Sequence, residues 1–253
     1  MKNMFLSLGL ILSIWTSPSF AHDPDGRVSL ELDSTTFQAG AVLLTFQLVD
    51  IQTKTLLKDT DLAISNEKKL HFIVYDKALE EFRHEHPVYV TDHWEVTVQL
   101  PRNGDYFTFA QGQLAADGYE FSPYSELSVS GGLSANPVPT SFTEVRKAGS
   151  LGTNVTFPSQ KIQAEKEVMV NITFSRTDGT PVQLSPYLGA MAHVIGTPTD
   201  GDSLIHVHPM STSNPNVLML HATFPEVGYY RLWIQFIDGG ILKVAPLMIE
   251  VVK

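Results

Sequence analysis

Six of the nine histidines in this chain form two copies of one pattern, in which a single histidine is followed 13 residues later by the sequence His-x-His-Pro. The members are His71, His84 and His86 in the first copy, and His193, His206 and His208 in the second. Imidazole is a common ligand of copper, zinc and nickel. Alternate residues on a β-strand share a face, so each His-x-His pair can present two rings to one ion, and an adjacent strand can supply a third. The pattern therefore predicts metal binding.

Sulfur donors near the second copy indicate which metal. Beyond residue 4, every methionine lies in the second half of the chain, at Met169, Met191, Met210, Met219 and Met248. Thioether and imidazole together favour copper, including Cu(I), over magnesium or calcium. We therefore predict Met191, Met210 and His221 as further ligands and copper as the bound metal, with zinc and nickel as the alternatives.

Two other functions stay open at this stage. Histidines on strands are often structural, and a duplication copies a structural motif as faithfully as a functional one, so the chain could be a non-catalytic envelope or protein-interaction module. A metalloenzyme is the other alternative, because His206-Val207-His208 resembles part of copper/zinc superoxide dismutase. The rest of that pattern is missing, and the sequence contains neither G-x-S-x-G nor any cysteine for a Cys/His pair. We expect no enzyme.

The elements that must carry these residues are strands. Apolar and polar residues alternate over 42–48, 94–100, 168–174 and 218–224, which is the pattern of strands with one buried face. The histidine pattern repeats at an offset of 122 residues, and Tyr106, Phe109 and Gln111 match Tyr230, Trp233 and Gln235 at an offset of 124. A Gly-x-Tyr before the next-to-last strand is typical of the tyrosine corner. We predict an all-β fold of two tandem immunoglobulin-like antiparallel β-sandwich domains, residues 22–143 and 144–253, joined within 136–150.

The first residues predict where the protein works. Lys2, an apolar run over 5–15 and Ser19-Phe20-Ala21 make residues 1–21 a secretory signal peptide, too short to span a membrane. Cleavage there would expose His22 as a terminal chelator. The chain has no cysteine and a net charge of −10, which argues against disulfides, lipid anchoring and a nucleic-acid partner. We expect a periplasmic or secreted protein with no membrane span.

The chain resembles a loosely defined group of bacterial secreted or periplasmic proteins with tandem immunoglobulin-like domains, and more remotely the YtkA-like class. The resemblance rests on a strand-borne histidine, the HxHP motif and a closing F-P-x-x-G-x-Y strand, which are best seen in residues 189–193, 206–209 and 224–230. Some members of this group are linked with copper or heavy-metal handling. The resemblance implies a protein that buffers ions or transfers them to another periplasmic metal-handling protein.

Overall fold

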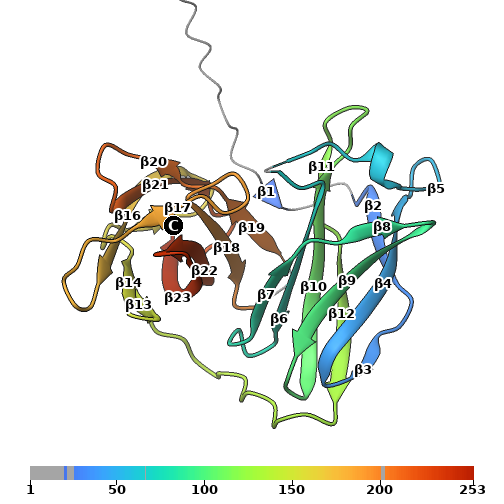
Figure 1. Cartoon of the computed structure of the whole chain (residues 1–253), viewed down its shortest axis with the longest axis horizontal. Coiled ribbons are helices and arrows are strands. Elements are labelled where there is room, and N and C mark those ends of the chain that lie inside the picture. The colour runs from blue at the N-terminus through green and yellow to red at the C-terminus, as the bar shows by residue number, and fades with distance from the viewer. Residues whose placement is uncertain (1–19, 22–25, 66, 201–202) are drawn as a thin grey trace, which may run out of the picture.

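The computed structural model describes residues 20–21, 26–65, 67–200 and 203–253, and it is built almost entirely of β-strands (Figure 1). The predicted signal peptide lies outside these residues except for Phe20 and Ala21, and so does His22. Among the described residues no helix is both long and apolar enough to cross a membrane. The two halves of the chain form two immunoglobulin-like β-sandwiches that lie side by side, which confirms the predicted fold class (Figure 1).

Domain 1 contains a five-stranded and a six-stranded sheet, with one short 3-10 turn at Asp59–Asp61. The five-stranded sheet consists of β2 (Val28–Leu32), β4 (Gly40–Asp50), β5 (Thr55–Leu56), β8 (Val88–Val90) and β9 (His93–Leu100). The six-stranded sheet consists of β3 (Thr36–Gln38), β6 (Leu70–Asp76), β7 (Phe82–Glu85), β10 (Gly104–Gln113), β11 (Glu120–Phe121) and β12 (Tyr124–Ser130). Burial alternates along β4 and β9, as the sequence predicts.

Domain 2 repeats this plan with a five-stranded and a seven-stranded sheet. The five-stranded sheet consists of β13 (Lys147–Ser150), β14 (Thr153–Thr156), β16 (Glu167–Arg176), β20 (Met210–Ser211) and β21 (Val217–Thr223). The seven-stranded sheet consists of β1 (Phe20–Ala21), β15 (Ile162–Gln163), β17 (Leu184–Ser185), β18 (Ala192–Pro198), β19 (Leu204–Val207), β22 (Gly228–Asp238) and β23 (Ile241–Val252). The segment between β12 and β13 links the two sandwiches.

The expected tyrosine corner is present in both domains. The hydroxyl of Tyr106 donates to the carbonyl of Arg102 at 3.0 Å, and the hydroxyl of Tyr230 donates to the carbonyl of Glu226 at 3.3 Å. Both tyrosines are almost fully buried, so this bond satisfies a hydroxyl that would otherwise be unpaired in the core.

The strands that carry the first histidine of each copy are buried on both faces. All seven residues of β6 are buried, and β18 is buried from Ala192 to Thr197. One face of each strand packs into its own domain, and the other packs against the second domain (Figure 1). This interdomain core consists of Ile73, Tyr75, Leu79, Phe82, Phe107, Phe109, Ile195, Leu204 and Trp233. The Phe82 and Trp233 rings stack across it with centroids 4.7 Å apart.

Candidate metal centre

The three histidines of each copy, called a triad below, lie close to those of the other copy beside the interdomain core. The ring of His206 is 5.2 Å from that of His71 and 5.3 Å from that of His84, and the rings of His84 and His193 are 5.6 Å apart, measured between centroids. Ligand atoms of His71, His84 and His206 lie within 4.8 Å of one another, and so do those of His193, His206 and His208. The two copies thus form one six-histidine centre rather than two separate sites.

Strand alternation places the rings there. On β19, Ile205 and Val207 enter the core of domain 2, so Leu204 and His206 face domain 1. This is the division between core and ligand residues that the sequence predicts for the second copy. On β18, Ala192 and Val194 enter the same core, which leaves His193 on the interdomain face.

The first copy follows the same geometry. On β6, Leu70 and Phe72 enter the core of domain 1, so His71 shares the interdomain face with Ile73. His84 is buried on β7 and is paired in register with Ile73. In both copies the strand ends just before the second histidine of the His-x-His pair, at Glu85 and at Val207.

In His71 and His193, the ring nitrogen that points away from the other histidines contacts a backbone carbonyl oxygen. Nε2 of His71 lies 3.2 Å from the carbonyl oxygen of Ser65, and Nε2 of His193 lies 2.8 Å from that of Tyr187. Because a carbonyl only accepts, these Nε2 atoms carry the proton and leave an unshared pair on Nδ1. Ser65 and Tyr187 are themselves 122 residues apart, so the repeat extends to these acceptors.

Glutamines from the opposite domain orient the rings of His84 and His206. Nδ1 of His84 donates to Oε1 of Gln235 at 2.8 Å, and Nδ1 of His206 donates to Oε1 of Gln111 at 2.5 Å. Each glutamine thus holds a histidine of the other domain and leaves the unshared pair on its Nε2. Sequence reasoning matched Gln111 with Gln235 in the repeat but assigned neither to the site. The sequence did contain a signal for them, because both positions are glutamine although most other residues of the two copies differ.

Because of these four hydrogen bonds, the ring nitrogens that carry unshared electron pairs face each other within each half. His71 Nδ1 is 3.0 Å from His84 Nε2, and His193 Nδ1 is 3.2 Å from His206 Nε2. His86 Nε2 completes the first set, 3.3 Å from His71 Nδ1. With no cation between them, such pairs repel. Metal–nitrogen bonds of about 2.0–2.1 Å in tetrahedral geometry place ligand nitrogens about 3.3 Å apart, close to the separations in both copies.

The surroundings keep these imidazoles neutral. Burial, together with the charges of neighbouring histidines, lowers the pKa of His71 to about 4 and the pKa of His86 and His208 to about 3. The pKa values of His84, His193 and His206 are also lowered, again chiefly by burial. A proton between the facing nitrogens is therefore disfavoured at neutral pH, and the rings are in the form that binds metal.

A small pocket opens beside the centre. Its volume is about 20 Å³, room for about one water molecule. His71, His206, His208 and Gln111 line it, together with Ser65, Gly112, Gln113 and Glu120. Nε2 of His208 is buried and has no hydrogen-bond partner among the described residues. A buried polar atom without a hydrogen-bond partner costs folding free energy, so Nε2 of His208 is a further candidate to bind an ion.

Two of the remaining predicted ligands, Met210 and His221, lie on the five-stranded sheet of domain 2. Met191 is half-buried and packs against the domain core. His221 is on β21 of the five-stranded sheet, on the face turned away from the core, whereas His193 projects from the outer face of the opposite sheet. Met210 is on β20, next to β21. The three residues were predicted to complete the second site, and the structure places His221 on the other sheet of domain 2, away from the six histidines.

Comparisons with known proteins assign no activity to this chain. A family model described as a domain of unknown function, DUF8832, matches residues 147–253. No curated protein matches the chain. Neither this family model nor the structures below support the expected resemblance to HxHP-bearing or YtkA-like proteins.

Several solved structures are similar in fold. The fibronectin(III)-like modules of CbhA from Clostridium thermocellum are 14% identical, with 88% of this chain and 94% of that chain covered and a TM-score of 0.24. The Escherichia coli adhesin FdeC is 14% identical, with 94% and 66% covered and a TM-score of 0.28. The titin A168–A169 structure is 11% identical, with 93% and 99% covered and a TM-score of 0.22. TM-scores this low carry no argument about this chain.

Proposed function

We propose that this protein binds transition-metal ions, copper first, at the six-histidine centre between its two domains, and that it buffers or transfers them. The observation that supports this proposal is a pair of ring nitrogens that face each other in each half, His71 with His84 and His193 with His206. In each of these rings the other nitrogen donates to a carbonyl oxygen, so the facing nitrogen carries no proton. A cation between them removes the repulsion.

The donor set supports copper, with zinc and nickel as alternatives. All six side chains at the centre are imidazoles, which suit copper, zinc and nickel, and a given site binds Cu(II) more tightly than the other common divalent ions. The six rings divide into two triads of three. We infer that the centre holds up to two ions, one in each triad, with the rings of His71, His84, His193 and His206 lying between the two positions.

A periplasmic or secreted location fits this proposal, because free thiols are prone to oxidation outside the cytoplasm and this chain contains none. Transfer would need a partner, and we propose another metal-handling protein of the same compartment. In this proposal the ion passes through the small pocket lined by His71, His206 and His208, which has room for about one water molecule.

Metal titration of wild-type protein and matched variants tests the proposal. We expect up to two equivalents of Cu(II) or Zn(II) to bind, and His84→Ala combined with His206→Ala to abolish binding. The matched control is His93→Ala, because His93 is held by Asp92 and Glu95 on the surface of domain 1. A wild-type protein that binds no ion, with a melting temperature unchanged by any of them, would overturn the proposal and favour an interaction module with structural histidines.

A further inference from the structure

A second group of metal-binding side chains lies on the outer face of the five-stranded sheet of domain 2. Met169 on β16 is directly opposite His221 on β21, and Met210 on β20 is directly opposite Met219 on β21. Met219 and His221 are two residues apart on the same strand, so their side chains share a face. The alternating Leu218, Leu220 and Ala222 fill the domain core, which places this face toward solvent.

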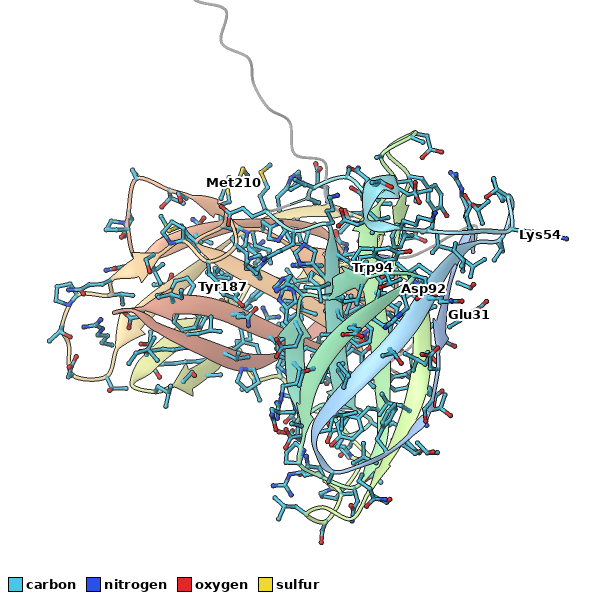
Figure 2. All side chains as sticks on the ribbon, turned by 45° about the vertical axis from the view of Figure 1, so that its right-hand side comes forward. Glu31, Lys54, Asp92, Trp94, Tyr187 and Met210 are labelled. Carbon is cyan, nitrogen blue, oxygen red and sulfur yellow. The ribbon has the colours of Figure 1, made fainter. Side chains whose placement is uncertain are left out.

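Two of these methionines, Met169 and Met210, are unusual in their exposure, and Met219 is half-buried. Met169 is 61% exposed and Met210 is 39% exposed, whereas Met248 is only 3% exposed. Methionines in β domains usually fill gaps in the core, as Met191 and Met248 do here. Figure 2 shows sulfur atoms at the surface beside Met210. An exposed thioether contributes little to folding, so its presence on this face calls for a different role.

The spacing allows the donors to converge. Opposed residues on neighbouring strands have Cβ atoms about 4.5–5.5 Å apart, and alternate residues on one strand are about 6.5–7 Å apart. Met169 and Met210 flank β21 from its two sides. Methionine has three rotatable side-chain bonds, so its sulfur can move several ångströms toward a point above Met219 and His221.

A carboxylate lies beside the imidazole in this group. Oε1 of Glu167 lies 2.6 Å from Nε2 of His221. This contact does not have hydrogen-bond geometry, so it does not assign the proton of His221 to either ring nitrogen.

We propose that Met169, Met210, Met219 and His221 form a separate surface site for a soft monovalent ion, Cu(I) or its analogue Ag(I). Thioether sulfur selects such ions over harder divalent ones. The six-histidine centre contains no sulfur donor, so the two sites differ in the ion that they prefer. This inference does not depend on metal binding at the histidine centre, and either site can exist without the other.

Titration with Ag(I) of protein carrying ¹³C-labelled methionine methyl groups tests the site directly. We expect the methyl signals of Met169, Met210 and Met219 to shift together and to saturate at one equivalent. Met191 and Met248 serve as internal controls and should not move. Unchanged signals for the three surface methionines, or equal shifts in all five, would overturn the proposal and leave an apolar surface patch.

Conservative variants separate this site from the histidine centre. Met169→Leu combined with Met219→Leu should weaken Ag(I) and Cu(I) binding by at least about tenfold, since even loss of a group that only supports a ligand costs about 10–100-fold. Met248→Leu should leave the affinity unchanged. The methyl shifts should persist in the His84→Ala, His206→Ala variant; loss of these shifts there, with the fold intact, would show that the ion was bound at the histidine centre.

Discussion

At the scale of single residues, the properties of the centre depend on two glutamines as much as on the histidines. Gln111 and Gln235 each accept a hydrogen bond from a histidine of the opposite domain. These bonds fix which ring nitrogen carries the proton, and therefore which nitrogen points at the ion. The backbone carbonyls of Ser65 and Tyr187 do the same for His71 and His193.

Replacing Gln111 with leucine should lower both the stability of the protein and its metal affinity, although Gln111 is not itself a proposed ligand. Nδ1–H of the buried His206 would lose its acceptor, which costs about 1–3 kcal/mol of folding free energy. Metal affinity should fall by about 10–100-fold. Chemical unfolding and metal titration measure both effects, and Gln99→Leu on an exposed part of β9 is the control. Equal metal affinity in Gln111→Leu and wild type would contradict this role.

The histidine pKa values also predict how stability depends on pH. Burial holds the pKa of His71, His86 and His208 well below the ordinary value of 6.5, so the unfolded chain binds these protons first as pH falls. The free energy of unfolding should be unaffected by them above about pH 6.5 and should fall between about pH 6.5 and 4, with a slope of about 1.4 kcal/mol per pH unit for each histidine.

Urea unfolding of metal-free protein at pH 7.5, 6 and 5 measures this slope. Saturation with metal should raise the free energy of unfolding at each of these pH values without removing the slope, because the folded centre carries no proton on these rings in either form. An unfolding midpoint that stays constant from pH 7.5 to pH 5 would show that the six rings are not held neutral in the folded protein.

At the scale of elements, strands buried on both faces bring the triads together. Strand β22 carries both Gln235 and Trp233 on the face toward domain 1, and β6 carries His71, Ile73 and Tyr75 on the face toward domain 2. The hydroxyls of Tyr75 and Thr197 are hydrogen-bonded across the interface at 3.0 Å. A strand of this kind has an almost continuous apolar run, unlike the alternating pattern of β4 or β16.

Two substitutions at Trp233 should separate packing from polarity in this interface. Trp233→Ala should destabilise the protein by about 3–5 kcal/mol through the cavity it leaves, and should weaken metal binding because the domains lose a principal contact. Trp233→Phe should cost much less, since the indole N–H is buried without a hydrogen-bond partner among the described residues. Chemical unfolding gives both values, and equal losses for the two variants would contradict this account.

At the scale of the whole molecule, the two domains are arranged with approximate two-fold correspondence around the centre. Residues 122 positions apart occupy equivalent places, as His84 does with His206 and Ser65 with Tyr187. The same correspondence pairs Tyr75 with Thr197, which bind each other. Each domain supplies one triad, and each domain also supplies the glutamine that orients the other triad.

A metal bound at this centre should therefore stabilise both domains together. At a free metal concentration 100-fold above Kd, we expect a gain of about 2.7 kcal/mol in unfolding free energy. Calorimetry should show that metal raises the melting temperature of the entire molecule in a single transition. If metal moves only one of two separate transitions, one domain alone holds the ion, and the shared centre is wrong.

The sequence by itself determined the strands, the duplicated pattern and the six histidines, because side-chain alternation and residue spacing are local properties of a strand. It also indicated that Ile205 and Val207 enter the core while His206 does not. Which outer faces of the two sandwiches meet was decided by tertiary packing around Phe82 and Trp233, residues distant along the chain. That packing joined the two triads, recruited Gln111 and Gln235, and left Met210 and His221 with a different sheet. No local pattern records such contacts, since they depend on the fit between two completed domains.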